Sequence, residues 1–150
     1  MSSSQLLSRA KLTRQFRKQL AGQLYDESGV TPDGVAIYSL SDPRDIREVR
    51  YIGQTTAPPR RLLQHVGTAR LWLPDERPWW VKSPKLRPLY DWIRELYRDE
   101  ERLPVMVVLA WTEVGHAKVL ERSTIYDCLQ RKLPVLNVER ERLGQQITLI

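Results

Sequence analysis

The chain has 150 residues, of which 41% are apolar and 28% charged, the balance of an ordinary soluble globular protein of one domain. Its one cysteine, Cys128, excludes an intramolecular disulfide and a cysteine-rich zinc site. No apolar run is long enough to span a bilayer, and the N-terminal residues lack the apolar run of a secretory signal. We therefore expect a cytoplasmic protein that has no membrane partner.

The net charge of +6 is unevenly distributed along the chain. Residues 1–25 hold +5 because they contain five basic side chains and no acidic one: Arg9, Lys11, Arg14, Arg17 and Lys18. The rest of the chain therefore carries only +1. A basic balance is typical of a protein that binds a phosphate backbone. Composition alone favours a nucleic acid only slightly, with the five basic residues as candidate contacts.

Apolar residues at three- and four-residue spacing predict an amphipathic helix over residues 4–25. A turn-rich connector follows and ends at Gly34. This pattern divides the chain into a basic helix with its connector (1–33) and a second unit (34–150). The added helix would contact a DNA backbone or a protein partner; the alternative is that its apolar face packs on the second unit and leaves the charges solvated.

The second unit begins with two strand-like runs, near 35–40 and 49–54, joined by a loop of about eight residues. Thr55 or Thr56 would cap the next helix, whose first turn tolerates two prolines because those positions need no N–H group. This helix should end near residues 68–71. Residues 72–80 are too rich in proline to be regular, and their three tryptophans are more typical of packing than of a linker. Stacking of Trp79 and Trp80 on an unpaired base is the less favoured alternative.

The remaining elements follow from length and periodicity. A helix is expected over about 88–101, a buried strand over 105–111 and a last helix over about 114–132. Residues 146–150 alternate in polarity and would add a strand or contact a partner. Together these elements predict an α/β (α+β) fold in which a small three-stranded central sheet is flanked by helices, with the added N-terminal helix.

Four residues of the hairpin and its following helix have side chains suited to phosphodiester chemistry. A hairpin can place Tyr38 and Tyr51 side by side on one face, where two phenols could share a proton network around a water. Arg61 and His65 lie one helical turn apart on the same face. Guanidinium groups hold phosphate oxygens, and imidazoles move protons near neutral pH.

Glu121 is unusual because it lies within the apolar stripe of its helix, four residues from Ala117 and four from Ile125. An unpaired ionised carboxylate is costly to bury. One partner that removes this cost is Mg²⁺, which takes one or two protein carboxylates and keeps several waters. The other interpretation is a glutamate at the edge of the stripe that pairs with an arginine.

The runs Ala36-Ile37-Tyr38 and Tyr51-Ile52-Gly53, followed by Arg61 and His65, resemble the signatures of the GIY-YIG endonuclease family. Glu121 resembles the carboxylate that this family carries later in its sequence, after the arginine and the histidine. The resemblance covers roughly residues 34–138. The chain departs from the family pattern by an alanine in place of the first glycine, and by the long Trp-rich segment before Glu121.

This resemblance implies a metal-dependent endonuclease that hydrolyses DNA phosphodiester bonds with one Mg²⁺ or Mn²⁺ on Glu121. Water would attack phosphorus with help from the two tyrosines and His65, while Arg61 would stabilise the phosphate. One tyrosine would act on the water, and we favour Tyr38. Asn137, which resembles the family's asparagine, would hydrogen-bond the C-terminal segment onto the active-site helix; an ordinary turn asparagine is the alternative.

Two other functions fit the same residues. The chain could be a module that binds nucleic acid or a partner without cutting, although the intact set of candidate catalytic residues argues against this. It could also be a nuclease subunit or effector that acts inside a larger assembly. No second DNA-binding motif is recognisable in the sequence, so structure recognition, a homodimer or a protein partner would have to supply specificity.

Overall fold

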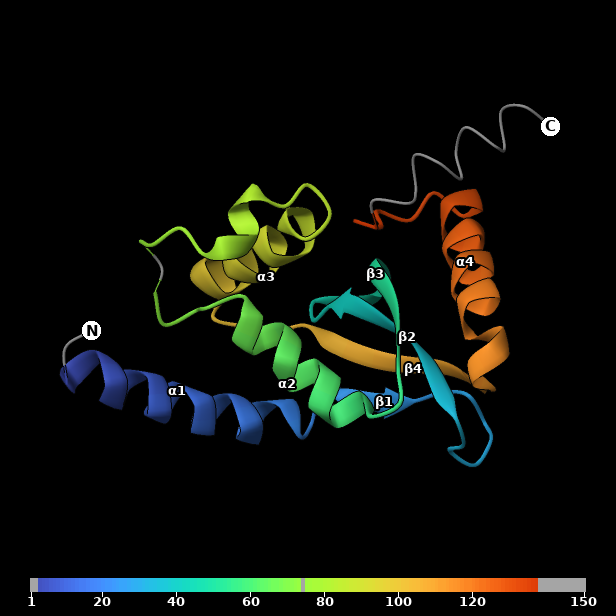
Figure 1. Cartoon of the computed structure of the whole chain (residues 1–150), viewed down its shortest axis with the longest axis horizontal. Helices are drawn as coiled ribbons and strands as arrows, with labels where there is room; N and C mark the ends of the chain where they lie inside the picture. Colours follow the sequence, from blue (N-terminus) through green and yellow to red (C-terminus); the bar gives the residue numbers. More distant parts are fainter. Residues whose placement is uncertain (1–2, 74, 138–150) are drawn as a thin grey trace.

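The structure is a computed structural model that describes residues 3–73 and 75–137 (Figure 1). In chain order the elements are α1 (Ser3–Leu20), β1 (Leu24–Asp26), β2 (Val35–Asp42), β3 (Asp45–Thr55), α2 (Pro58–Thr68), the 3-10 helix η1 (Trp79–Lys82), α3 (Arg87–Glu100), β4 (Val105–Thr112) and α4 (Val114–Gln130). The strand or partner contact expected over 146–150 lies outside the described residues. Within the described part of the chain, no helix has the length and apolar character needed to cross a membrane.

The sheet has four strands in the described residues, in the order β1-β4-β2-β3, so the expected three-stranded sheet is wrong. The α+β class is confirmed, and the sheet is mixed because β1 runs parallel to β4 while the other pairs are antiparallel. The missed strand lies where the helix was expected to continue, since α1 ends at Leu20. Gln23 fixes the new direction, because its side-chain amide donates to the carbonyls of Leu103 (2.7 Å) and Pro104 (2.9 Å).

Strands β2 and β3 form a longer hairpin than the sequence indicated. The expected eight-residue loop is replaced by a tight connection, because β2 extends to Asp42 and β3 begins at Asp45. The buried Asp42 carboxylate organises this turn by accepting hydrogen bonds from the backbone N–H of Arg44 (2.9 Å) and from its guanidinium (2.7 Å). A charged pair therefore closes a hairpin whose first strand is buried along its whole length.

Helices cover both faces of the sheet, and successive residues of a strand belong to different cores. The larger core joins α1, α2 and α3 to one face through residues such as Tyr38 and Leu40. The smaller core joins α4 to the other face through Ile37 and Ile52. Figure 1 shows α4 apart from the other helices. A residue on the edge strand β3 can therefore contribute to either side of the sheet.

Helix α1 shares the larger core. Phe16 and Leu20 are buried, and the Phe16 ring meets the edge of the Tyr97 ring with centroids 5.5 Å apart. The side chains of Arg14, Arg17 and Lys18 are exposed. The N-terminal helix is therefore packed on the rest of the chain, as the solvated-charge alternative expected, while these basic side chains stay accessible.

The irregular segment before α3 is held by one arginine and one tryptophan. Arg94 donates to the backbone carbonyls of Leu73 and Glu76, and its guanidinium lies 5.7 Å from the centre of the Trp80 ring. Trp80 is fully buried and donates its indole N–H to the Thr68 carbonyl at 2.7 Å. Trp79 is 62% exposed, so the expectation that all three tryptophans pack is wrong for this one.

Candidate active site

The hairpin register brings the two tyrosines together. Tyr38 is opposite Gly53, and Tyr51 is opposite Leu40, so the phenols occupy diagonal positions on one face of the sheet. Their ring centres are 6.4 Å apart. Both rings also contact His65, at centroid distances of 5.9 Å for Tyr38 and 5.7 Å for Tyr51. The predicted side-by-side placement is confirmed.

Gly53 makes room for the Tyr38 ring. A Cβ atom at this position would lie 2.6 Å from Cζ of Tyr38, and closer still to its hydroxyl oxygen. Contacts this short do not occur in folded proteins, so the phenol can cross the strand here only because the residue opposite is glycine. The last residue of the Tyr51-Ile52-Gly53 run therefore positions the first tyrosine.

Prolines occupy the first positions of α2, as the sequence predicted, but the expected threonine cap is wrong. The N-cap residue is Ala57, and no side chain caps the first turn. The Thr55 hydroxyl instead accepts a hydrogen bond from the N–H of Ala57, before the helix, at 3.1 Å. Arg61 and His65 follow one turn apart and both face the tyrosines. The expected pairing of these two residues is thus present.

His65 is completely buried between two phenols. Its Nε2 atom is 2.7 Å from the Tyr38 hydroxyl, and its Nδ1 atom is 3.2 Å from the hydroxyl of Tyr90 on α3. Burial, together with the positive charge of Arg61, lowers the pKa of His65 to about 3. The imidazole is therefore neutral at neutral pH, with one nitrogen donating and the other accepting.

Tyr38 is also buried, with 1% of its surface exposed. Burial raises the pKa of Tyr38 well above its usual range, and Tyr51 adds to this effect. The Arg61 guanidinium acts in the opposite direction and lowers that pKa. Tyr38 is thus protonated in the free protein, and the neighbouring cation is the group that favours its phenolate.

The candidate catalytic residues meet at a pocket of about 130 Å³. Its lining includes four residues predicted from the sequence: Tyr51, Arg61, Glu121 and Asn137. Tyr90, Lys85 and two leucines complete it. These groups come from β3, α2, the start of α3, α4 and the segment after α4. The pocket therefore combines two phenols, a guanidinium, an ammonium and a carboxylate, while Tyr38 and His65 lie beside it.

Glu121 reaches this pocket from α4. Its neighbours one turn away, Ala117 and Ile125, are buried, so the predicted place within the apolar stripe is confirmed. The side-chain amide of Gln54 on β3 donates to Oε2 of Glu121 at 2.6 Å. This hydrogen bond links α4 to the sheet edge and orients the carboxylate.

Asn137 closes the outer edge of β3. Its Oδ1 atom accepts from the N–H of Ile52 at 3.0 Å, and its Nδ2 atom donates to the Ile52 carbonyl at 2.8 Å. The preceding Leu136 N–H donates to the carbonyl of Arg50 at 2.6 Å. The predicted structural hydrogen bond exists, but its expected partner was wrong: Asn137 joins the strand that carries Tyr51, because its amide reproduces the pattern of a paired strand residue.

A single divalent cation fits the donors present. Among residues 3–73 and 75–137, no three histidine, cysteine or acidic side chains form a metal-ligating group. Glu121 is a carboxylate that faces a pocket and is oriented by a neutral amide. Mg²⁺ is commonly held by one or two carboxylates together with waters and substrate phosphates, so one such ligand is sufficient.

The basic residues of the N-terminal helix, Arg60 and His116 are not in this pocket. Of the N-terminal set, the side chains of Lys11, Arg14, Arg17 and Lys18 are exposed on α1, and the Arg9 side chain is not among those described. Arg60, next to Arg61, is exposed and contributes to a different, apolar groove between α1 and α2. His116 is exposed beside Glu113 at the start of α4.

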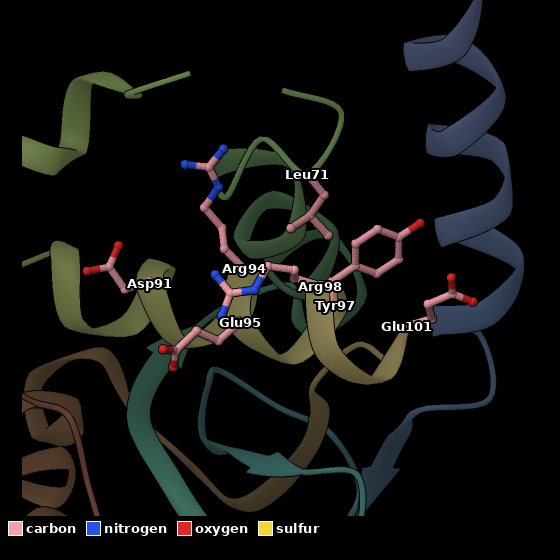
Figure 2. Close-up of a pocket in the computed structure, with 7 residues that line it drawn as sticks. All are labelled: Leu71, Asp91, Arg94, Glu95, Tyr97, Arg98 and Glu101. Carbon is pink, nitrogen blue, oxygen red and sulfur yellow. The ribbon is translucent and has the colours of Figure 1, made fainter. Parts of the chain in front are cut away.

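A separate and larger pocket of about 440 Å³ lies on the outer side of α3 (Figure 2). It contains Asp91, Arg94, Glu95 and Arg98 but none of the residues predicted to act on a substrate. Figure 2 shows Arg94 extending away from α3, in the direction of the loop that it holds. This pocket therefore belongs to the region where Arg94 anchors the irregular segment before α3.

Sequence reasoning missed three residues of the site. Tyr90 carried a signal, because it lies three residues before Ile93 and seven before Tyr97 on the apolar face of α3. Gln54 carried a weaker one, since it alternates with Ile52 and so faces α4. Nothing in the local sequence marks Lys85, which reaches the pocket from the turn before α3.

Comparisons with protein-family models, with curated proteins and with solved structures find no match to this chain.

Proposed function

We propose that the protein is a metal-dependent endonuclease of the GIY-YIG type, which hydrolyses DNA phosphodiester bonds. The observation that carries this proposal is the convergence of Tyr51, Arg61 and Glu121 on one pocket, with Tyr38 hydrogen-bonded to His65 beside it. These groups are far apart in sequence and come from both sides of the sheet. A role in packing alone would not require a phenol, a guanidinium and a carboxylate to face the same space.

In the proposed reaction, Arg61 binds the non-bridging phosphate oxygens and offsets the charge that develops on them. Tyr51, which lines the pocket, orients the attacking water. The water oxygen forms a bond to phosphorus as its proton passes to the Tyr38 oxygen, and Tyr38 gives its own proton to Nε2 of His65. The opposite P–O bond breaks, and the departing oxygen takes a proton from solvent.

The neutral state of His65 suits this path. An imidazole that is already protonated could not accept from Tyr38, whereas the low pKa leaves Nε2 available when Nδ1–H donates to Tyr90. The imidazolium that forms is offset by the negative charge of the bound phosphate. The sequence suggested that His65 assists the attack on phosphorus. Because its imidazole is completely buried, His65 would act through Tyr38 and not directly on the substrate.

Glu121 is the residue that would hold one Mg²⁺ or Mn²⁺, oriented by Gln54. When bound, such an ion supplies charge stabilisation for the departing oxygen. Because the carboxylate and Arg61 line the same pocket, a phosphate held by the arginine lies within reach of the ion. Removing the carboxylate should therefore abolish cleavage while leaving phosphate binding by Arg61 in place.

The test is a cleavage assay on supercoiled, linear and single-stranded DNA with Mg²⁺ or Mn²⁺. Wild-type protein should cut only with the divalent ion, and Glu121→Gln should not cut. Glu113→Gln provides the matched control, because this exposed carboxylate lies at the start of the same helix. Failure of the wild-type protein to cut any substrate, or cutting by Glu121→Gln at the wild-type rate, would refute the proposal. Binding without cutting would favour the non-cleaving module.

A second test removes only the two hydroxyls. Tyr38→Phe and Tyr51→Phe should both fold, because each ring keeps its packing, and both should lose activity in the range of about 10²–10⁴-fold typical of proton transfer. If both variants cut at the wild-type rate, the two tyrosines serve only in packing.

A further inference from the structure

A second polar pocket lies next to the candidate active site, between α1, α2 and η1. Its volume is about 420 Å³, and its walls carry Thr13, Gln64, Arg70, Trp72 and Trp79. We call it the Trp79 pocket. Its floor is apolar, since buried Phe16 and half-buried Leu63 also line it.

Trp79 stands out among the aromatic residues of this region. It is 62% exposed, whereas the adjacent Trp80 is fully buried. An exposed indole places a large apolar surface in water, and this surface does not contribute to the core of the fold. Trp79 is also the first residue of η1, directly after Pro78, so its backbone is held in a short helix. A rigid, solvent-facing indole beside hydrogen-bonding side chains is suited to stacking on a flat partner.

Gln64 links this pocket to the candidate active site. Its side-chain oxygen accepts a hydrogen bond from the Arg61 guanidinium at 3.4 Å, and it also lines the Trp79 pocket. Arg61 and Gln64 are three positions apart on α2, which corresponds to about 4.5 Å along the helix axis. Gln64 therefore links the proposed phosphate-binding arginine to the wall of the Trp79 pocket.

Arg70 lines the pocket, and the two chain segments that contribute residues to it are basic. Residues 58–87 contain seven basic side chains and only two acidic ones, Asp75 and Glu76. Helix α1 adds five basic residues and no acid. Each of these segments holds +5, while the whole chain holds +6, so the rest of the molecule is net acidic. The positive charge is thus concentrated on the two segments that enclose the Trp79 pocket.

We infer that the Trp79 pocket binds one unpaired nucleobase of the substrate, next to the phosphodiester held by Arg61. The inference rests on the proposed function and specifies its substrate: nucleic acid that is single-stranded, or has a base out of the stack, near the cut. The indole of Trp79 stacks on the base, and Gln64, Arg70 and Thr13 hydrogen-bond to its edges. A base inside a duplex is covered on both faces and cannot stack in this way.

Binding of a short fluorescein-labelled oligo-dT strand and of a labelled duplex tests this inference by fluorescence anisotropy. The Glu121→Gln background keeps both probes intact. Because one stacked base contributes roughly 1–3 kcal/mol, Trp79→Ala should weaken binding of the single strand about 5- to 100-fold and that of the duplex much less. Trp79→Phe should retain most of the affinity. The control is Tyr126→Ala, another exposed aromatic, on α4, and it should bind as the parent does.

Tryptophan fluorescence gives an independent readout of stacking. Oligo-dT should quench the tryptophan fluorescence of the parent protein, and that quenching should be smaller in Trp79→Phe, which keeps a ring but loses one of the two indoles that line the pocket. If Trp79→Ala weakens strand and duplex equally, or behaves as Tyr126→Ala does, the inference is overturned.

The outcome for the pocket can be separated from the outcome for the nuclease. Trp79-dependent strand binding by a wild-type protein that cuts nothing would support the pocket and refute the nuclease. Cutting of duplex and single strand by Trp79→Ala at the wild-type rate, with unchanged strand affinity, would refute the pocket and leave the nuclease standing.

Discussion

Gly53→Ala should destabilise the fold and disrupt the site at the same time. The added methyl group would lie 2.6 Å from Cζ of Tyr38 and 3.0 Å from its Cε1 atom. The phenol cannot move aside freely, because it is buried and its hydroxyl is hydrogen-bonded to His65. Either the ring shifts and loses this bond, or the two strands separate locally.

The size of the effect follows from three contributions. Overpacking a well-packed core typically costs about 1–3 kcal/mol, and losing the Tyr38–His65 hydrogen bond adds about 1 kcal/mol. Replacing glycine by alanine returns about 0.4–1 kcal/mol by restricting the unfolded chain. We therefore expect the free energy of unfolding to fall by about 1–3 kcal/mol, with the urea midpoint falling in proportion and the m-value unchanged.

Gly67→Ala is the matched control. This glycine lies in α2, and a Cβ there would meet no atom within 4 Å. The control should be neutral or stabilised by up to about 1 kcal/mol, since alanine is the better helix former. Combining Gly53→Ala with Tyr38→Phe removes the atom in closest contact, so the double variant should lose less stability than the two single losses added together. If Gly53→Ala has the same urea unfolding midpoint as the wild-type protein, the role assigned to Gly53 is wrong.

Three further predictions concern charge. Arg61→Ala should lose far more cleavage activity than Arg60→Ala, because only Arg61 lines the site. Equal losses would show that the phosphate-binding role of Arg61 is wrong. The pKa of His65 is lowered from 6.5 to about 3 in the folded state, so the unfolded state binds more protons between these values and stability is lost as the pH falls below 6.5. Urea unfolding at pH 7 and pH 5 should differ by about 2 kcal/mol in wild type and by much less in His65→Gln, and an equal difference in both would contradict the buried neutral imidazole. Replacing the exposed Arg14 and Lys18 of α1 by Gln should keep the fold but reduce the slope of log affinity for DNA against log salt by roughly 0.9 per lost phosphate contact; an unchanged slope would leave a protein partner as the role of this helix.

The local elements and the first half of the candidate site could be predicted from the amino-acid sequence. Apolar patterning indicated α3, α4 and the strands β2, β3 and β4, because each buries a face whose spacing is set by its own backbone geometry. The prolines after β3 indicated where α2 begins. Tyr38, Tyr51, Arg61 and His65 were predicted together because a hairpin followed at once by a helix brings them close through local geometry. Glu121 was predictable because a carboxylate in an apolar stripe requires a partner.

The contacts between distant segments depend on tertiary packing and could not be predicted from the sequence. The three-residue strand β1 is too short to show alternation, and it exists because β4 offers an edge for pairing. Tyr90 completes the hydrogen bonds of His65 from α3, Gln54 orients Glu121 across the sheet edge, and Asn137 pairs with Ile52. None of these pairings follows from sequence spacing, since each depends on how separate elements pack.

The same packing decided the ionisation state and accessibility of residues whose identities were evident from the sequence. A histidine on a helix is ordinarily a proton carrier near neutral pH, but enclosure between two phenols and beside Arg61 keeps His65 neutral. Two adjacent tryptophans are indistinguishable in sequence, yet Trp80 is fully buried and Trp79 is exposed. Residue type fixed which chemistry was available, and burial in the tertiary fold decided which atoms could perform it.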